Sequence, residues 1–203
     1  MADRPRPYRN RVTPLGEIVA TPEYGTLMGN RGCLHNEEGH IVRQASRIAW
    51  ISCLPRCPGI KRTLMKPGHY TELFFLDEPT ALAAGHRPCG ACRPEALLAF
   101  KTAWAAAHQL SALPRVAEID QQLAMERGRL ASCEQPEELP DGAMVTDAEA
   151  NQIWLRWHGQ WWRWSFKGYG APTHSLPGSA QQITSPACIA TLAAGYRPRL
   201  PLP

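Results

Sequence analysis

The sequence lacks any apolar run that approaches the ~20 residues needed by a membrane-spanning helix. The basic N-terminal residues (MADRPRPYRN) are not followed by an apolar segment, so the start of the chain does not resemble a secretory signal. Only 20% of the 203 residues are charged and 44% are hydrophobic, as in ordinary globular proteins. We therefore expect a cytoplasmic protein without membrane contact, large enough to bury a core of its own.

The sequence also lacks a serine or carboxylate motif at a spacing that indicates hydrolysis. His35, His40 and His69 are the histidines on which a hydrolase would depend, and none has such a motif beside it. A hydrolase is therefore the least supported of the function classes that the sequence allows.

Four of the seven cysteines form two short pairs, in the segments ISCLPRCPGIKR (51–62) and GHRPCGACRP (85–94). Three residues separate Cys53 from Cys57, two separate Cys89 from Cys92, and 31 lie between the pairs. Two thiolates in one turn converge on a single ion, and two such turns complete a tetrahedral zinc site. The spacing predicts a four-cysteine Zn²⁺ site. A thioredoxin-like redox role fits poorly, because a helix that ends at glycine, then His-Arg-Pro, precedes the second pair.

Other residues offer alternative ligands. Cys33 and His35 form another short chelating pair, and His69 lies in a Pro-Gly turn, so either could replace the first cysteine pair or complete a mixed site. Cys133 and Cys188 have no such neighbours and are interpreted as bystanders. Because the chain is expected to be cytoplasmic and its cysteine count is odd, a disulfide framework is disfavoured.

The pattern of the chain predicts an α+β fold. Short apolar stretches between Leu15 and Cys53, broken by glycine turns, predict a small antiparallel sheet. Residues 1–12 are rich in arginine and proline, which predicts an extended basic arm. A buried strand over 73–76 is followed by a short helix over 78–84, capped by Asp77 and ended by Gly85. Further helices are predicted from Pro94 and over 115–128.

The last third of the chain has a different sequence pattern from the cysteine-containing part. Residues 131–142 (ASCEQPEELPDG) are acidic and non-periodic, which predicts a linker between a region 1–130 and a region 143–203. Residues 152–164 alternate around His158-Gly159 and predict a tryptophan-rich β-hairpin, whose rings pack within the sheet or stack on bases. ALAAGHRP (81–88) recurs as TLAAGYRP (191–198), either as a degenerate repeat that has lost its cysteines or as a common helix ending.

Charge is distributed unevenly along the chain. Residues 1–70 hold 11 Lys and Arg against 5 Asp and Glu, whereas residues 71–203 hold 11 against 13. A basic front half favours a polyanionic partner such as DNA, and a solvated basic face is the alternative.

Residues 45–108 resemble the N-terminal zinc-binding domain of the Ada DNA-repair proteins. The resemblance rests on the order of CLPRCP (53–58), Phe74-Phe75 and ALAAGHRPCGACRP (81–94). It implies a small α/β domain with zinc held by Cys53, Cys57, Cys89 and Cys92, binding to the DNA backbone, and repair of methyl phosphotriesters with Cys53 as methyl acceptor. Basic residues that flank this site would contact phosphates, namely Arg56, Lys61, Arg62, Arg87 and Arg93.

The chain departs from that family in several places. The gap between the cysteine pairs is longer, His86 stands where Phe is usual, and the Pro-Cys-His-Arg-Val alkylguanine-transfer motif and paired helix-turn-helix modules are absent. The first predicted function is a zinc-dependent, Ada-like DNA-binding protein, with methyl transfer to Cys53 as its furthest form. The second is a non-catalytic module with structural zinc, whose tryptophan-rich region binds a protein partner.

Overall fold

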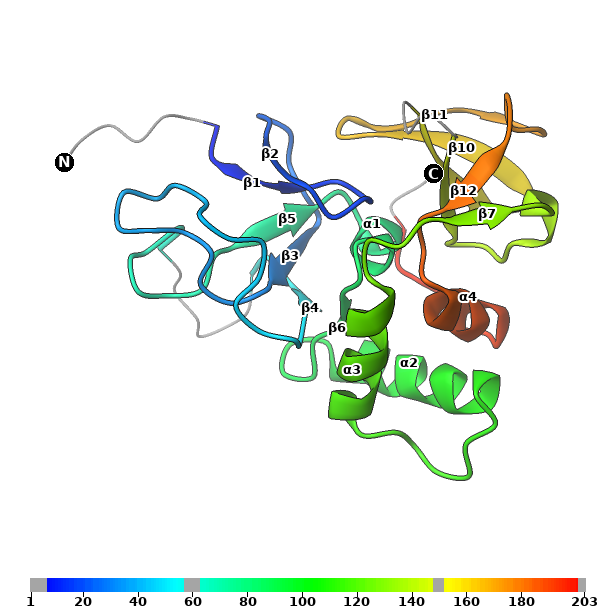
Figure 1. Cartoon of the computed structure of the whole chain (residues 1–203), viewed down its shortest axis with the longest axis horizontal. Coiled ribbons are helices and arrows are strands. Elements are labelled where there is room, and N and C mark those ends of the chain that lie inside the picture. The colour runs from blue at the N-terminus through cyan, green and yellow to red at the C-terminus, as the bar shows by residue number, and fades with distance from the viewer. Residues whose placement is uncertain (1–6, 57–62, 148–151, 201–203) are drawn as a thin grey trace.

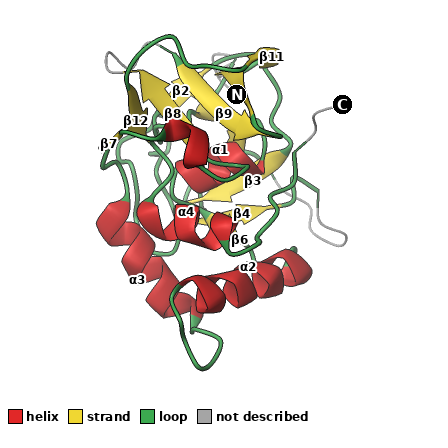
Figure 2. Cartoon of the chain, turned by 90° about the vertical axis from the view of Figure 1, so that its right-hand side faces the viewer, coloured by secondary structure: helices red, strands yellow, loops and turns green. Residues whose placement is uncertain are grey.

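The computed structural model describes residues 7–56, 63–147 and 152–200. These residues form two six-stranded sheets and four short helices, so the α+β class is confirmed (Figure 1). One helix lies between the sheets, and the other three gather at one end of the molecule, as the turned view in Figure 2 shows.

The first sheet contains the strands from the front half of the chain. In spatial order they are β2(Ile18–Ala20), β1(Arg9–Val12), β5(Leu73–Phe75), β3(Leu27–Asn30), β4(Ile51–Cys53) and β6(Arg87–Pro88). The pairs β1/β5 and β4/β6 are parallel and the other neighbours are antiparallel, so the sheet is mixed rather than wholly antiparallel. The parallel pairs arise because β5 and β6 follow long connections that return the chain in the same direction.

Residues 9–12 form β1 rather than part of an extended arm. Val12 is fully buried, and the Nε atoms of the two strand arginines donate to backbone carbonyl oxygens, Arg9 to Ile18 at 2.9 Å and Arg11 to Glu23 at 2.6 Å. The prediction of a basic arm was wrong for this stretch, because arginine alternates with residues that face the core and its side chain satisfies neighbouring carbonyls.

The second sheet is antiparallel throughout. Its strands in spatial order are β11(Gly168–Thr173), β10(Gln160–Ser165), β9(Ile153–Trp157), β8(Met144–Asp147), β12(Ala180–Gln182) and β7(Ala131–Cys133). The predicted hairpin is present, with Trp157 opposite Gln160 across a turn in which His158 and Gly159 have φ of 50° and 71°. The segment 131–142 supplies edge strand β7 and a 3₁₀ turn, η1(Pro136–Glu138), to this half.

Three of the four helices begin at or within one residue of the start that the sequence predicts. They are α1(Glu78–Ala83), α2(Pro94–Ala107), α3(Val116–Glu126) and α4(Pro186–Ala193). The Asp77 carboxylate accepts the Thr80 backbone N–H at 2.9 Å, and Gly85 ends α1 with a φ of 77°. A side chain at Gly85 would also collide with Arg127, since a Cβ there would lie 2.6 Å from the arginine Cγ.

One apolar core joins elements from both halves of the chain. Its buried members come from all four helices and the segment after α4, and they include Leu82, Phe100, Trp104, Ile119, Leu123, Cys188, Leu192 and Tyr196. Helix α1 is also tied to the second half by polar contacts, since Tyr169 donates to Asp77 at 2.6 Å and Trp164 Nε1 to Thr80 at 3.0 Å. The helix α1 therefore holds the two sheets together.

Candidate metal centre

Two strands bring the distant cysteines together. β4 and β6 pair in parallel, with Ile51 opposite Arg87 and Ser52 opposite Pro88. Continuing this register places Cys53 beside Cys89 at the carboxyl ends of both strands, and the Cys89 amide donates to Ser52 at 3.0 Å. Cys92 lies in the turn that leads into α2.

The Sγ atoms of Cys53, Cys89 and Cys92 all lie within 4.8 Å of one another. Cys53 and Cys89 are 5% and 6% exposed, and apolar side chains including Met28 surround them. The backbone N–H of Leu54 donates to Cys92 Sγ at 3.3 Å. Sulfur atoms in such an apolar, amide-lined setting are suited to bind a thiophilic cation.

The three thiols differ strongly in acidity. Hydrogen bonds from the Cys53 thiol and from the amides of Cys92 and Ala91 lower the pKa of Cys89 to about 4, against the opposing effect of burial. The hydrogen bond to Cys89 and burial raise the pKa of Cys53, and burial raises that of Cys92. Because neighbouring thiolates repel one another, a divalent cation that binds all three sulfurs releases the remaining protons.

This donor set fits zinc. Three sulfurs at mutual distances below 4.8 Å are compatible with Zn–S bonds of about 2.3 Å to one ion. The fourth predicted ligand, Cys57, lies outside the described residues, as do Lys61 and Arg62. A cluster of three cysteines able to hold a metal ion is therefore present, and the four-cysteine site stays a prediction.

The alternative ligands are not part of this cluster. In the described part of the chain, no other group of three or more Cys, His, Asp or Glu is close enough to hold a metal. His35 is buried with both ring nitrogens engaged, Nδ1 with Thr71 Oγ1 at 2.6 Å and Nε2 with the Lys66 carbonyl at 3.2 Å. Cys33 Sγ contacts the carbonyl of His35 at 3.6 Å, and His69 is not in the group.

Two of the predicted phosphate-binding arginines are engaged inside the protein. Arg87 makes a bidentate ion pair with Asp120, at 2.9 and 2.8 Å. Arg93 pairs with Glu78 at 2.7 Å and donates to Ser52 Oγ at 2.9 Å. Both arginines are more than nine-tenths buried, so these guanidinium groups hold β6 and α2 in place and do not face solvent.

Arg56 is exposed beside Cys53, and the fold adds two arginines that sequence reasoning missed. A cavity of about 610 Å³ is lined by Cys92, Glu95, Arg197 and Arg199, and a neighbouring one of about 380 Å³ by Arg56 and Arg199. Both C-terminal arginines are exposed. The only signal in the sequence was the recurrence of LAAG followed by Arg-Pro in TLAAGYRPRL.

The recurring segments have the same local structure. In each, the helix ends at a glycine with positive φ, and the next ring, His86 or Tyr196, turns inward and is at most 3% exposed. The same pair of backbone hydrogen bonds closes the carboxyl ends of both helices. At the end of α1, Gly85 N donates to Leu82 O and His86 N to Ala81 O. At the end of α4, Gly195 N donates to Leu192 O and Tyr196 N to Thr191 O. The two copies then diverge, because cysteines follow the first and arginines the second.

The tryptophans of the hairpin pack inside the second half. Trp154 and Trp161 are 9% and 2% exposed. The other three are partly buried against an apolar cluster around Met144 and Leu155; they are Trp157, Trp162 and Trp164. These rings therefore stabilise the sheet and its contact with α1, as the packing interpretation predicts.

Comparison of the chain with protein-family models, with curated proteins and with solved structures finds no match. Within residues 7–56, 63–147 and 152–200, no helix combines the length and the apolar character required to cross a bilayer.

Proposed function

We propose that this chain is a zinc-dependent DNA-binding protein of Ada-like type. The observation that carries the proposal is the convergence of Cys53, Cys89 and Cys92 from two segments far apart in sequence. Cys57, four positions after Cys53 in the sequence, is the fourth ligand in this proposal. When bound, zinc keeps the sulfurs ionised at neutral pH and stabilises the turns from which they come.

The proposed DNA surface lies around the two cavities next to Cys92. Arg56, Arg197 and Arg199 line these cavities and are exposed. The carboxylates of the lining are Glu95 and Glu78, and Glu78 is already paired with Arg93. Guanidinium groups bind phosphate oxygens with charge-assisted hydrogen bonds. Arg87 and Arg93 are not phosphate ligands in this proposal, because their buried carboxylate partners already balance them, although Arg93 also lines the larger cavity.

Binding of a short DNA duplex is expected to weaken steeply with salt, because phosphate contacts release counterions. Replacement of Arg199 by glutamine is expected to reduce the slope of log affinity against log salt by about one, and the double Arg197→Gln, Arg199→Gln variant by about two. Fluorescence polarisation between about 50 and 200 mM NaCl measures both.

Arg163→Gln is the matched control, since Arg163 is an exposed arginine on β10 of the other sheet. It is expected to leave the slope unchanged. Absence of DNA affinity at every salt concentration would contradict the proposal and would favour the non-catalytic module with structural zinc.

Methyl transfer is the second form of the proposed function. The Cys53 sulfur would form a bond to the methyl carbon of a phosphotriester while the methyl C–O bond breaks, and the phosphodiester leaves with the electron pair and the negative charge. Because Cys53 is 5% exposed, this reaction requires the methyl group to reach a nearly enclosed sulfur, whereas Cys92 lines an open cavity.

Incubation with methyl-phosphotriester DNA is expected to add about 14 mass units to Cys53, as one methyl replaces one proton. Peptide mass spectrometry identifies the residue that carries the methyl group. Methylation of Cys92 instead would move the acceptor to the cavity wall, and an unmodified protein after exhaustive incubation would restrict the function to DNA binding.

A further inference from the structure

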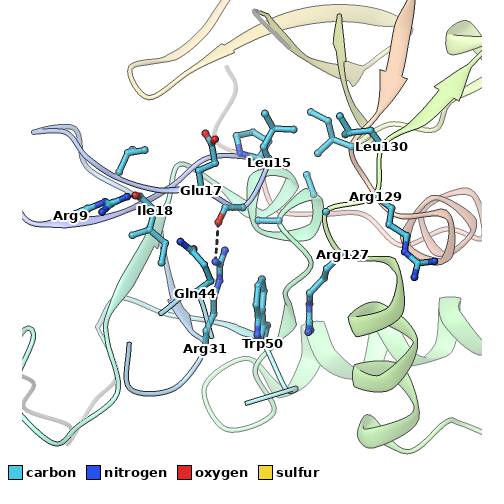
Figure 3. Close-up of a pocket in the computed structure, with 17 residues that line it drawn as sticks. Arg9, Leu15, Glu17, Ile18, Arg31, Gln44, Trp50, Arg127, Arg129 and Leu130 are labelled. Atoms are coloured by element: carbon cyan, nitrogen blue, oxygen red, sulfur yellow. Dashed lines mark hydrogen bonds between the residues drawn. The ribbon is translucent and has the colours of Figure 1, made fainter. Parts of the chain in front are cut away.

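A third cavity lies at the other end of β4 and β6 from the cysteines. It has a volume of about 580 Å³ and is bounded by residues 14–19, which form a loop and the start of β2, by Arg31 and Trp50, and by the segment over 127–130 that follows α3 (Figure 3). Cavities that bind small molecules commonly have this size. None of its lining residues belongs to the cysteine cluster or to the surface proposed for DNA.

Two arginines enclose a tryptophan on one wall of this cavity. The guanidinium carbon of Arg31 lies 3.9 Å from the centre of a Trp50 ring, and that of Arg127 lies 4.2 Å from it. In Figure 3 the two side chains stand on either side of the indole. Cation–π contacts with the indole therefore keep the two positively charged guanidinium groups close together.

Each guanidinium has a buried nitrogen that makes no hydrogen bond. Arg31 is 1% exposed, and it donates through Nε to His86 Nε2 at 3.1 Å and through Nη1 to the Gly16 carbonyl at 2.9 Å. Arg127 donates through Nε to the Gly85 carbonyl at 3.1 Å. Nη2 of each arginine is buried and makes no hydrogen bond, although nearly all buried N–H groups in proteins are paired.

The partners that these two arginines do have are neutral. His86 is fully buried, and burial followed by the nearby Arg31 and Arg127 holds its pKa well below the usual value, so the ring is uncharged. Burial and Arg127 lower the pKa of Arg31 to about 9. Between residues that the structure describes, no ion pair reaches Arg31 or Arg127, although Asp120 acts on Arg127 at longer range.

The cavity as a whole is cationic. Four arginines line it and Glu17 is the single carboxylate among the lining residues; the arginines are Arg9, Arg31, Arg127 and Arg129. The remaining walls include apolar side chains such as Leu15, Ile18 and Leu130. Uncompensated positive charge beside an apolar wall is costly unless an anion occupies the space.

We propose that this cavity binds a small organic oxyanion, a phosphate monoester or a carboxylate. Its oxygens accept hydrogen bonds from Nη2 of Arg31 and Nη2 of Arg127, and its apolar part lies against the wall near Leu15 and Ile18. A purely structural role for Arg31, in which it holds the loop before β2 through Gly16 and bonds to His86, accounts for Nη1 and Nε. It leaves the buried Nη2 without a partner.

The test uses the full chain with three probes in the absence of DNA: inorganic phosphate, phenyl phosphate and benzoate. Isothermal titration calorimetry is expected to show binding of phenyl phosphate or benzoate, with a matching rise in the thermal unfolding midpoint. Whichever of these two probes binds with the higher affinity shows whether the cavity prefers a phosphate or a carboxylate group. Inorganic phosphate is expected to bind more weakly, because it lacks the apolar part.

Arg127→Gln is expected to weaken binding of the better probe by about tenfold to a hundredfold, since one charge-assisted hydrogen bond is lost. Arg31→Gln is expected to act in the same direction, and if that variant does not fold, the half-buried Arg127 carries the test. Arg163→Gln is the control and is expected to bind as the unchanged chain does.

Two results would overturn the proposal: no binding of any probe at millimolar concentration, or equal affinity in Arg127→Gln and the unchanged chain. Equal affinity for inorganic phosphate and phenyl phosphate would show that the apolar wall does not contribute to ligand binding. Each readout is independent of zinc-dependent DNA binding, so either function can fail alone.

Discussion

Replacement of Cys89 by serine is expected to change the zinc content from one ion per chain to none. Cys89 Sγ is the sulfur that the Cys53 thiol and two backbone amides stabilise as a thiolate, and it lies within 4.8 Å of the other two sulfurs in the cluster. A serine hydroxyl stays protonated at neutral pH and is a poor zinc ligand. Metal analysis of the purified protein measures the effect directly.

The same variant is expected to lose much of the stability of the first sheet. Structural zinc contributes about 10–16 kcal/mol of binding free energy in small zinc domains, and that energy is available only to the folded state. Here β4 and β6 end at the cluster, so the loss falls on the edge of the sheet, while the shared helical core remains. Thermal unfolding with and without a chelator measures this contribution.

Three further cysteine variants make the experiment specific. Cys57→Ser is expected to behave as Cys89→Ser does, because Cys57 is the proposed fourth ligand. Cys33→Ser and Cys133→Ser are expected to keep the ion, since neither sulfur lies in the cluster. If Cys57→Ser retained zinc and Cys33→Ser lost it, Cys33 rather than Cys57 would be the fourth ligand. Absence of zinc from the wild-type protein would contradict the metal centre.

Replacement of Glu78 by glutamine is expected to lower the free energy of unfolding by about 3 kcal/mol or more. The Glu78 carboxylate is 1% exposed and makes three contacts: an ion pair with Arg93 at 2.7 Å, a hydrogen bond from Tyr196 Oη at 2.6 Å and one from the Arg199 amide at 2.8 Å. Glutamine keeps an acceptor oxygen but removes the charge that balances Arg93, and an uncompensated buried guanidinium is costly.

Glu118→Gln is the matched control, because Glu118 is also a helix residue that pairs with an arginine. Its ion pair with Arg115 is solvent-exposed and screened by water, so its loss is expected to change the stability far less than the loss of the buried Glu78 charge. Urea denaturation of both variants and the unchanged chain gives the comparison. Equal effects of the two substitutions would show that Glu78 and Arg93 are not coupled in the folded state.

The local signals in the sequence were reliable for the first three helices, the hairpin and the turn between Cys89 and Cys92. Asp77 and Gly85 mark the ends of α1, and His158-Gly159 forms the hairpin turn, because capping and positive φ depend on residues within one or two turns of the chain. The same holds for the spacing of Cys89 and Cys92, which places two sulfurs in one turn whatever surrounds it.

Arginine was the residue type for which sequence reasoning was least informative. Arg87 and Arg93 stand beside the cysteines in sequence, yet their guanidinium groups face Asp120 and Glu78, which come from α3 and α1. Arg199 lies more than a hundred residues from Cys92 in the chain and lines a cavity with it. A long side chain can reach solvent or a buried carboxylate, and its own neighbours in sequence do not decide which.

By itself, the sequence determined the α+β class, the starts of the first three helices, and the turn that presents Cys89 and Cys92. Only the tertiary structure decided that β4 and β6 pair in parallel, that α1 connects both sheets, and that Arg31 and Arg127 enclose Trp50 beside an open cavity. The reason is physical: turns and caps are closed by hydrogen bonds within a few residues, whereas strand pairing and charge compensation depend on groups that meet only after the chain has folded.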